Sequence, residues 1–518
     1  MTVYEVAVAA PLFNSLTYAG PVDGGDPLPV GLRVLAPLQN RSVTGYILAA
    51  LHSPPDVPYQ IKPLLEQLDP APLFPEQLLP FFRWIADYYH YPLGEVIQTA
   101  LPSGLRAGSG HEILLTDSGR RHLPAALCAL KPRAAWMDRF VEKGRLLPGT
   151  VRSIRGKSTV QRLLQTWQDK GWIEINKVLT GSAVKAKKEV AVRLNTALQQ
   201  GLPPYRTGAE EKTADDLPPA LLSPVLPEDL KKSERKTLEL FFRQCKGASA
   251  LPRSELTRGY AGAGRALHSL AEKGLISLEE QQVYRDPFGK VPPFFPQPEV
   301  LTPEQQQVID TLGGALDSGG FQPFLLHGVT GCGKTEVYLR AAEHCLSTTE
   351  KSVLVLVPEI ALSSQLEGHF YSRFGDILAI LHSGISPGER FDQWQRILQN
   401  KVRIVIGARS AVFAPLARPG LVIVDEEHEP AYKQDEGLRY NGRDMAVLRA
   451  KFADCPVLLA SATPSVTSFY HAEQGKYRLL SMSRRIHDQI MPDVTVVDLR
   501  QQQREKKHTF FSEQLLTA

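Results

Sequence analysis

The sequence predicts a multidomain protein that combines α/β and α+β units, and three observations support this expectation. The chain has 518 residues, several times the size of a usual domain, so we expect three to five domains. Residues 1–105 carry short apolar alternations and many prolines, which indicate a β-rich unit. From about residue 297 onward, short apolar strands alternate with helical segments, as in a parallel sheet covered by helices.

The N-terminal unit is expected to be a small sheet that closes with a helix. Its strands are predicted where apolar and polar residues alternate, at Val3–Val8, Gly31–Pro37 and Ser42–Leu48. A helix is predicted around Gln77–His90, because four bulky side chains recur there at helical spacing. They are Phe81, Trp84, Ile85 and Tyr88, and we expect them to pack into a core.

The middle of the chain contains an internal repeat. Residues 158–173 resemble residues 261–276, and each copy is an amphipathic helix that ends in Lys-Gly before a β-prone run. A further helix precedes each copy, near 133–143 and 234–245. An order of helix, helix, glycine and strand is typical of winged-helix modules.

Two winged-helix-like modules are therefore predicted, at 110–176 and 231–285. The residues between them, 177–230, are rich in proline and mixed in charge, which predicts a linker. Winged helices bind DNA in some proteins and dock other proteins elsewhere, so both roles remain open. A helical spacer without DNA contact is a third alternative for each module.

Residues 328–335 read Gly-Val-Thr-Gly-Cys-Gly-Lys-Thr, a complete G-x-x-x-x-G-K-[ST] phosphate loop. The loop follows the apolar run Phe324–Leu326 and precedes a helical stretch at Glu336–Cys345, which is the context that such a loop requires. Its backbone N–H groups and the helix N-terminus would surround the phosphates. Lys334 is expected to reach the β and γ phosphates, and Thr335 to ligate Mg²⁺. The loop residues predicted to bind ATP are Gly328, Thr330, Gly331, Cys332, Gly333, Lys334 and Thr335.

A second motif, Asp425-Glu426-Glu427-His428, follows a buried strand predicted at Leu421–Val424. The carboxyl ends of parallel strands meet at one edge of a sheet, so this motif should face the phosphate loop. Asp425 is expected to bind the metal, and Glu426 to position the water that attacks the γ-phosphate. Lys334, Asp425 and Glu426 are therefore the predicted catalytic residues, with ATP and Mg²⁺ as cofactors.

Three more strands of the same sheet are predicted, at Val353–Val357, Val402–Ile406 and Pro456–Ala460. A polar motif follows each of them, where open α/β sheets place their ligands. The motifs are Pro-Glu-Ile-Ala-Leu at 358–362, Gly-Ala-Arg-Ser-Ala-Val-Phe at 407–413 and Ser-Ala-Thr-Pro at 461–464.

Composition sets bounds on partners and compartment. The net charge of +4 permits a nucleic-acid partner without indicating one. The five cysteines include no C-x-x-C pair, which argues against a disulfide framework and against a zinc site of that kind. The N-terminus lacks the features of a secretion signal, and no apolar run approaches eighteen residues. We therefore expect a cytoplasmic protein without membrane contact.

Taken in order, these motifs resemble the first motor lobe of superfamily 2 DNA helicases, and more narrowly the PriA (primosomal protein N′) family of replication-restart helicases. Leu301–Gln305 and His382-Ser383-Gly384 complete the set. Tyr432–Tyr440 is typical of that family, and Ala86–Glu95 matches its opening domain. The resemblance implies a 3′-DNA-end-binding domain at 1–105 and a RecA-like lobe at 297–480.

The resemblance also implies roles for individual residues. Gln305 would read the adenine, and His428 would link the nucleotide site to the DNA track. Residues 431–443 would form a loop that couples DNA binding to hydrolysis, although an ordinary polar surface loop is the alternative. Within it, Tyr432 and Tyr440 offer rings for base stacking. The residues expected to contact the DNA backbone are Lys433, Arg439, Arg443, Arg409, Ser410 and the Pro358-Glu359 segment.

The family resemblance places a pocket for the 3′ end of DNA around Leu16, Thr17, Tyr18 and Lys62. The family commonly carries an acidic residue where this chain has Thr17. The hydroxyl of Thr17 could hydrogen-bond the terminal 3′ hydroxyl instead, and Lys62 is a candidate phosphate contact. Branched forks and single-stranded 3′ ends are therefore the expected DNA partners.

Some features of the family have no counterpart in this sequence. Residues 481–518 are expected to be a connector, with Phe511–Leu516 as the start of a second motor lobe. The motifs of that lobe, its arginine finger and the family's zinc-binding cysteines are not found here, so no zinc ligand is assigned. We therefore expect the chain alone to bind ATP weakly and to hydrolyse it slowly. An incomplete sequence of a longer helicase is the expected explanation, and a short paralogue is the alternative.

Two classes of function remain open at this point. The first is an ATP-driven 3′-to-5′ helicase that recognises stalled or repaired forks and recruits a primosome. The second is a non-catalytic scaffold that binds forks through the 3′-end domain and the winged-helix-like modules. Primosome proteins and a single-stranded-DNA-binding protein are the protein partners that the resemblance implies.

Overall fold

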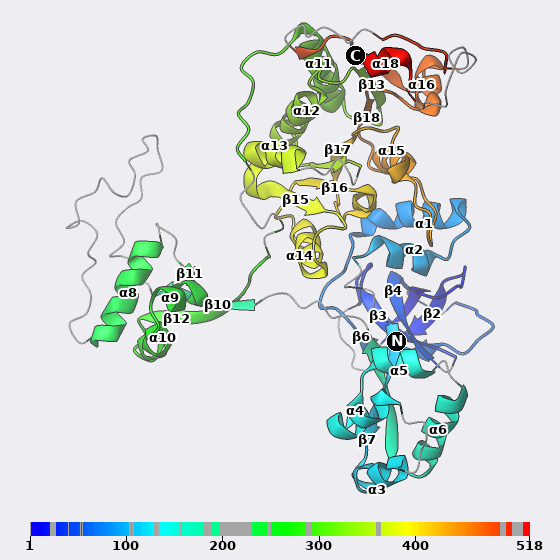
Figure 1. Cartoon of the computed structure of the whole chain (residues 1–518), viewed down its shortest axis with the longest axis vertical. Coiled ribbons are helices and arrows are strands. Elements are labelled where there is room, and N and C mark those ends of the chain that lie inside the picture. The colour runs from blue at the N-terminus through cyan, green and yellow to red at the C-terminus, as the bar shows by residue number, and fades with distance from the viewer. Residues whose placement is uncertain are drawn as a thin grey trace.

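The folded units follow one another along the long axis of the molecule, with the parallel-sheet lobe at one end and the first repeat at the other (Figure 1). The second repeat projects to one side of this axis. The chain is seen in a computed structural model, which describes residues 2–20, 27–39, 41–51, 53, 55–102, 105, 108–128, 134–155, 158–180, 188–195, 230–245, 250–285, 287, 293–358, 364–486, 494–499 and 511–517.

The N-terminal unit contains a six-stranded sheet, which confirms the β-rich unit expected from the sequence. The strand order is β5-β2-β1-β4-β3-β6, and the neighbours are antiparallel except for β2 and β5. One face of the sheet is buried over a small core around Val6, Val34 and Ile47. The strands are β1 (Val3–Val8), β2 (Leu16–Ala19), β3 (Arg33–Leu38), β4 (Arg41–Leu51), β5 (Lys62–Pro63) and β6 (Glu66–Gln67).

The predicted helix after this sheet is present, but only part of its apolar face is buried. It consists of the short η1 (Glu76–Leu78) and α1 (Leu79–Tyr88), and α2 (Leu93–Ala100) follows. Phe81 and Ile85 are buried as expected. The expectation was wrong for Tyr88, which is 62% exposed and stacks on the half-buried Trp84 with ring centroids 4.6 Å apart. Trp84 packs against the edge of the core, whereas Tyr88 lies outside it, on the solvent side of Trp84.

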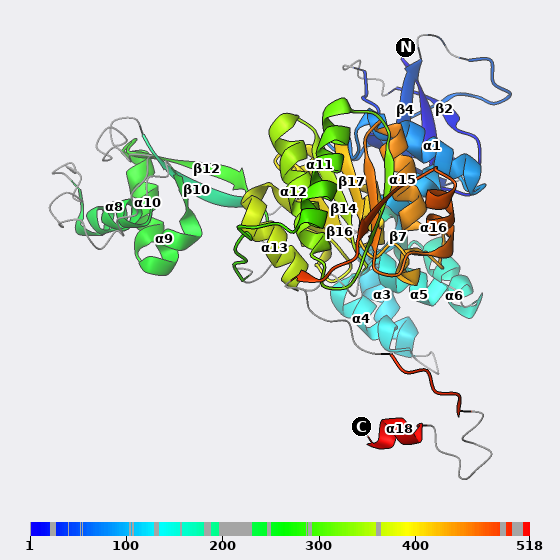
Figure 2. The same ribbon diagram turned by 90° about the horizontal axis from the view of Figure 1, so that it is seen from above.

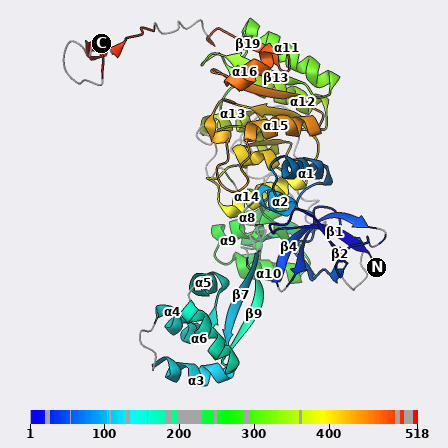
Figure 3. The ribbon, with the colours of Figure 1, turned by 90° about the vertical axis from the view of Figure 1, so that its right-hand side faces the viewer.

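The first repeat is a three-stranded antiparallel sheet with helices, in the strand order β8-β7-β9. Its long strands β7 and β9 run away from the N-terminal unit (Figure 3). The elements are β7 (Gly108–Leu115), α3 (Asp117–Cys128), α4 (Ala135–Lys143), β8 (Arg145–Leu146), α5 (Pro148–Arg155), α6 (Ser158–Asp169) and β9 (Ile173–Thr180).

The second repeat has the same topology, with the strand order β11-β10-β12. The repeated Lys-Gly ends its helix in the same way, since Gly171 and Gly274 have φ angles of 67° and 69° that favour glycine. Its elements are β10 (Lys188–Leu194), α8 (Lys232–Gln244), β11 (Ala250–Pro252), α9 (Arg253–Gly259), α10 (Ala263–Glu272) and β12 (Ile276–Gln282).

The prediction of a linker at 177–230 was wrong at both ends of its described part. The end of β9 reaches Thr180, and β10 at 188–194 is the central strand of the second repeat. The sequence did not show this strand as part of the repeat, because 37 residues, from 195 to 231, separate it from α8, the next described helix. Most of these, 196–229, lie outside the described residues. The assignment of winged-helix-like modules stays a prediction.

The C-terminal half contains a seven-stranded parallel sheet, as the sequence predicted. The strand order is β15-β16-β14-β17-β18-β13-β19, so β13 with its phosphate loop lies beside β18. Two strands, β15 and β19, were not predicted. The strands are β13 (Pro323–Gly328), β14 (Ser352–Leu356), β15 (Leu378–Leu381), β16 (Ile404–Gly407), β17 (Pro419–Val424), β18 (Val457–Ser461) and β19 (Arg478–Met482).

Helices cover both faces of this sheet (Figure 2). Because successive side chains of a strand point to opposite faces, Val353 and Val355 pack under α11–α13, whereas Leu354 and Leu356 pack toward α14 and α15. The described helices are α11 (Pro303–Ser318), α12 (Lys334–Thr348), α13 (Ser364–Phe374), η5 (Gly375–Ile377), α14 (Pro387–Leu398), η6 (Arg409–Phe413), η7 (Pro430–Tyr432), α15 (Gly442–Phe452), α16 (Val466–Glu473) and α18 (Glu513–Thr517). None of them is long and apolar enough to cross a bilayer.

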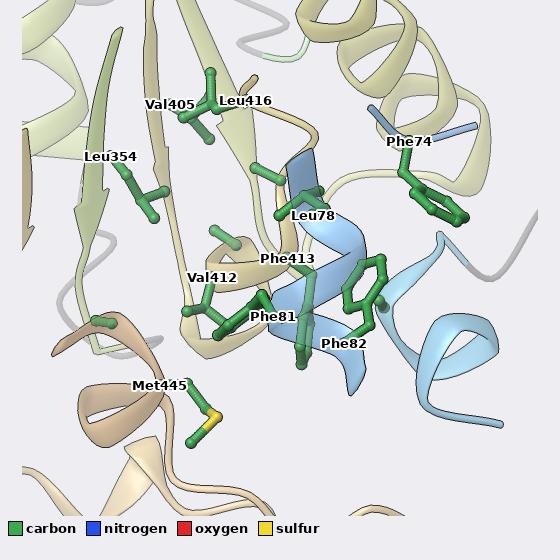
Figure 4. Close-up of a cluster of buried hydrophobic side chains, with 14 of the residues drawn as sticks. Phe74, Leu78, Phe81, Phe82, Leu354, Val405, Val412, Phe413, Leu416 and Met445 are labelled. Carbon is green, nitrogen blue, oxygen red and sulfur yellow. The ribbon is translucent and has the colours of Figure 1, made fainter. Parts of the chain in front are cut away.

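The N-terminal unit and the parallel-sheet lobe share one hydrophobic core. Phe81 of α1 packs against Phe413 of η6 with ring centroids 6.2 Å apart (Figure 4). The indole Nε1 of Trp394 donates a hydrogen bond of 2.8 Å to the backbone oxygen of Leu73. These contacts join α1 and the residues before it to the side of the sheet that α14 and α15 cover.

The described residues between the second repeat and the lobe, 283–285, 287 and 293–302, include two contacts with the lobe. The guanidinium of Arg285 forms an ion pair of 2.8 Å with Asp392 on α14, whose side chain is fully buried. Further along, Phe295 stacks on His369 of α13 at 4.0 Å between ring centroids. This segment is therefore fixed to two helices of the lobe.

Candidate nucleotide-binding and DNA-binding site

The phosphate loop connects β13 to α12 at the carboxyl edge of the sheet. Gly331 and Gly333 have φ angles of 82° and 84°, which place the loop in a conformation that favours glycine. A side chain at Gly333 would also collide with the Gln305 amide, 2.2 Å from an ideal Cβ. The N-terminus of α12 thus points its backbone N–H groups at the space above the loop.

Lys334 lies between the loop and the acidic motif. Its Nζ donates a hydrogen bond of 3.0 Å to the backbone oxygen of Gly328 and lies 3.8 Å from Oε1 of Glu426. The structure therefore brings two of the predicted catalytic residues together from positions more than ninety apart. A γ-phosphate would replace Glu426 as the anion nearest to the ammonium group.

Asp425 directly follows β17 and is fixed by its neighbours. Its Oδ1 accepts hydrogen bonds from the hydroxyl of Tyr338 at 2.7 Å and from the backbone N–H of Glu426 at 3.0 Å. Burial raises the pKa of Asp425, and the hydrogen bond from Tyr338 opposes this change. Tyr338, which lies fully buried on α12, was not among the residues predicted from the sequence.

The residues around Asp425 fit a magnesium ion. Oδ2 of Asp425 has no hydrogen-bond partner among the described residues. Thr335 is the second residue of α12, directly after the phosphate-loop lysine. Hard oxygen ligands of this kind suit Mg²⁺, which also keeps several waters and substrate phosphates in its shell. When bound, the ion would neutralise phosphate charge, and the burial that raises the pKa of Asp425 would favour a nearby cation.

Glu426 adopts a backbone conformation that is uncommon outside glycine. Its φ angle is 41°, in the left-handed region, two residues after the end of β17 at Val424. Non-glycine residues in this region cluster at functional sites, because surrounding contacts must hold them there. Here the hydroxyl of Tyr432 donates a hydrogen bond of 2.7 Å to the backbone oxygen of Asp425 and fixes the turn.

Gln305 is tied to the protein at both ends of its amide. Its Oε1 accepts from the backbone N–H of Thr302, in a capping box at the start of α11, and its Nε2 donates to the backbone oxygen of Cys332. The side chain is buried and braces the phosphate loop. The predicted contact with adenine stays a prediction, and it requires one of these bonds to open.

Glu427 is the centre of a hydrogen-bond network that the sequence analysis did not single out. Its buried carboxylate accepts from the backbone N–H of Ser465 at 2.6 Å and from the hydroxyl of Ser468 at 2.8 Å. It also pairs with Arg443 at 3.1 Å. The network joins the acidic motif to the start of α16. The only feature of the sequence that pointed to Glu427 was its position beside Glu426, just after the end of a predicted strand.

Arg443, for which we expect a contact with DNA phosphates, is paired within the lobe in this structure, and the DNA contact stays a prediction. Its guanidinium binds Glu427, Asp444 and the hydroxyl of Ser465, and its side chain is only 15% exposed. A position one residue into α15 placed it against the sheet rather than toward solvent. Arg443 is therefore a structural cation of the lobe.

His428 connects the acidic motif to the Ser-Ala-Thr-Pro motif. Its Nδ1 lies 2.7 Å from the hydroxyl of Ser461, which in turn accepts a hydrogen bond from the backbone N–H of Thr463. His428 also lies 3.6 Å from Glu426. These contacts connect Glu426 to the end of β18, and the predicted link of His428 to the DNA track stays a prediction.

Tyr432 and Tyr440 do not offer rings for base stacking in this structure. Both are buried, and Tyr440 packs edge-on against Phe413 at 5.0 Å between ring centroids. Burial raises the pKa of Tyr440 to about 12. The sequence placed both rings in a polar loop, but the loop folds back and uses them as its core.

The exposed basic residues of the same loop keep their predicted position. Lys433 and Arg439 are exposed, and Nζ of Lys433 donates to the backbone oxygen of Arg439 at 3.1 Å. The guanidinium of Arg409 donates hydrogen bonds to the backbone oxygens of Ala431 and Lys433, so it stabilises the conformation of the loop. Ser410 is exposed next to it.

A pocket of about 150 Å³ opens between this loop and the ends of the strands. Its lining includes Pro358, Ser383, Arg390, Arg409 and Ser410, from three of the predicted motifs and the start of α14. The remainder of the 358–362 motif, 359–362, lies outside the described residues. The pocket provides two arginines and small polar groups, which are suited to a phosphate.

Residues 482–486 lie across the phosphate loop, a contact that the sequence did not predict. The backbone N–H of Ile486 donates to the oxygen of Gly331 at 3.0 Å, and Ser483 donates to Glu304 at 2.7 Å. Arg485 lies beside Gly331. The start of the predicted connector is therefore a wall of the nucleotide site.

The four residues of the predicted 3′-end pocket lie together at one edge of the N-terminal sheet. Leu16, Thr17 and Tyr18 are on β2, and Lys62 is the direct register partner of Tyr18 on β5. Thr17 and Tyr18 are buried, whereas Lys62 is exposed. Glu5 on the neighbouring strand β1 is the register partner of Thr17. An acidic side chain is therefore nearby, although none stands at position 17.

Two family models match this chain. One, described as a 3′DNA-binding domain, covers residues 5–102, and the other, described as a DEAD/DEAH box helicase, covers residues 302–470. Replication restart protein PriA of Bacillus subtilis is 32% identical over 487 residues, which cover 94% of this chain. The chain is similar to PriA over almost its whole length.

Other proteins named PriA are also similar to this chain. PriA of Synechocystis is 31% identical over 508 residues, which cover 94% of this chain and 55% of the relative. PriA of Treponema pallidum is 47% identical over 199 residues, which cover 38% of this chain and 30% of the relative. The chain spans a little over half the length of the Bacillus and Synechocystis proteins, at 56% and 55%.

Proposed function

We propose that this chain acts in a replication-restart DNA helicase that uses ATP and Mg²⁺ and moves 3′ to 5′. The observation that carries the proposal is the position of Lys334, 3.0 Å from the Gly328 oxygen and 3.8 Å from Glu426, between a phosphate loop and a metal-binding strand end. Asp425 would hold Mg²⁺ with Thr335, and Glu426 would orient the attacking water.

The DNA side of the proposal rests on charge at two places. Lys62 at the edge of the N-terminal sheet would contact a phosphate near a 3′ end, with Thr17 and Glu5 as candidate partners of its terminal hydroxyl. On the lobe, Lys433, Arg439 and the pocket beside Ser410 would hold the backbone without reading sequence. Stalled and repaired forks, primosome proteins and a single-stranded-DNA-binding protein are the partners we propose, in the bacterial cytoplasm near the nucleoid.

We also propose that residues 1–518 taken by themselves hydrolyse ATP slowly. The family resemblance assigns an arginine finger to a second motor lobe, and such a residue supplies about 10³-fold or more in rate. The test is DNA-stimulated ATP turnover by this polypeptide. Fast turnover that Lys334→Ala abolishes would overturn slow hydrolysis and support the nucleotide site at once.

A non-catalytic fork-binding scaffold is the second candidate, favoured by the duplicated three-stranded modules. Binding to forked and plain duplex DNA over a range of salt concentrations separates the two proposals. A scaffold binds forks equally with and without ATP, and Lys334→Ala leaves that binding unchanged. For a helicase, ATP changes the affinity for single-stranded 3′ tails, and Lys334→Ala removes the change.

A further inference from the structure

A second pocket, of about 220 Å³, lies where the N-terminal unit meets the parallel-sheet lobe. Its walls come from α1, from the residues that lead into β14 and β17, and from the end of α15. The nucleotide site occupies the carboxyl ends of these strands, whereas this pocket lies at their amino ends. The two sites are therefore on opposite edges of the same sheet.

The walls of this pocket are positively charged. Lys351, Arg418 and Arg449 all line it, and no aspartate or glutamate does. Among the residues that the structure describes, none hydrogen-bonds or ion-pairs with the side chains of Lys351 and Arg418. The stem of Lys351 crosses Gly420, where an ideal Cβ would lie 2.7 Å from the Lys351 Cβ, so glycine is needed for this path.

Arg449 adds a buried charge without a carboxylate partner. Its side chain is 2% exposed, and it donates to the backbone oxygens of Val412, Ala414 and Leu416. Its Nε has no partner among the described residues. Burial lowers the pKa of Arg449 to about 9. An anion nearby would offset the cost of holding this charge away from water.

Two phenylalanine rings also line the pocket, beside small and aliphatic side chains. Phe81 and Phe452 meet edge-on at 6.3 Å between ring centroids, and Phe452 is 43% exposed. The exposed amide of Gln77 stands at the rim. Cations beside an exposed ring suit a ligand that carries both a phosphate and a planar base.

We propose that this pocket binds the 5′-phosphoryl group of a nucleotide, with Lys351 and Arg418 on the phosphate and the base against Phe452. The volume suits the phosphoryl end, and the base would lie at the exposed rim. The source is either a free nucleotide or the 5′ end of a DNA strand, since both present the same chemistry. The proposal does not depend on hydrolysis at the phosphate loop.

The test uses the full chain with Lys334→Ala, so that the phosphate loop does not contribute. Calorimetry measures binding of a nucleoside 5′-monophosphate, of a 5′-phosphorylated dinucleotide and of the nucleoside without phosphate. We expect phosphate-dependent binding of at least one ligand, weakened at least tenfold by Lys351→Gln or Arg418→Gln, because each removes a charge-assisted contact. The ligand that binds identifies the source.

Lys232→Gln, an exposed lysine of the second repeat, is the matched control and should leave binding unchanged. Lys351 and Arg418 are not core residues, so their variants should fold, which a thermal melt checks. The proposal is wrong if none of the ligands binds, if the nucleoside binds as well as its monophosphate, or if both substitutions leave the affinity unchanged.

Discussion

Neighbouring side chains decide what each residue of the acidic motif can do. Asp425 is held by Tyr338, Glu426 faces Lys334, Glu427 is buried under α16, and His428 meets Ser461. Four consecutive residues thus serve four different contacts. The positive φ of Glu426 makes this possible, because it turns the chain sharply where the strand ends.

Charge at the phosphate loop leads to the first prediction. Lys334→Ala should weaken ATP binding at least tenfold, because the ammonium is the nearest cation to the γ-phosphate site. Glu426→Gln should bind ATP at least as tightly as the parent chain, because it removes the carboxylate 3.8 Å from Lys334. Titration with a fluorescent ATP analogue measures both. Glu429→Gln is the control, and weaker binding by Glu426→Gln would contradict the assignment.

Arg443 provides the second prediction, since the structure and the sequence disagree about it. Arg443→Gln should lower the free energy of unfolding by about 3 kcal/mol, because Glu427 would remain buried without its cation. The salt dependence of DNA binding should not change. In contrast, Lys433→Gln should reduce the slope of log affinity against log salt by about one. A reduced slope for Arg443→Gln at unchanged stability would restore the original interpretation.

At the scale of elements, the duplicated module shows how one topology survives large changes in sequence. Both copies pair the first strand with the other two, and both turn from helix to strand at a glycine with positive φ. The second copy also contains a buried ion pair that holds two of its helices together. In the second copy the buried Glu234 of α8 binds Lys273 at 2.8 Å and Ser269 at 2.7 Å, which fixes α8 on α10.

The ion pair of Glu234 and Lys273 leads to the third prediction. The hydrogen bond from Lys273 lowers the pKa of Glu234 to about 2, from an ordinary value of 4.5. The carboxylate therefore stabilises the module above about pH 4.5, and this contribution is lost as the pH falls toward 2. Glu234→Gln should cost about 2 kcal/mol at pH 7 and much less at pH 3. Calorimetry of the full chain tests this, with the exposed Glu239→Gln as control; an equal cost at both pH values would refute it.

At the scale of the whole molecule, the N-terminal unit packs directly against the parallel-sheet lobe and shares a core with it. Phe81 packs against Phe413 and Phe452, and Tyr89 accepts a hydrogen bond of 3.4 Å from the backbone N–H of Asn441. Asn441 caps α15, the helix that carries Arg443. A short chain of contacts therefore runs from α1 to the buried Glu427.

The fourth prediction tests this shared core. Phe81→Ala should lower the free energy of unfolding by about 3–5 kcal/mol, because a fully buried ring leaves a cavity between two units. Thermal unfolding should then separate into two transitions. Tyr88→Ala is the matched control on the same helix and should change stability by less than about 1 kcal/mol, since Tyr88 is exposed. Equal effects of the two variants would show that α1 does not join the units.

The sequence by itself determined the features that depend on local order along the chain. The phosphate loop, the acidic motif, the parallel strands that precede them and the repeated helix with its glycine were all visible, because each is a contiguous pattern with its own physical cause. The class of fold followed from the alternation of these patterns.

Only the tertiary structure decided which side chains face water and which face one another. Tyr432, Tyr440 and Arg443 looked like a DNA-binding set in a polar loop, yet two are core and one is a buried ion pair. Strand β10 joined its module across a gap of 37 residues, and Glu427 and Tyr338 gained their roles from residues far along the chain. Burial and pairing are properties of space, and spacing along the chain does not record them.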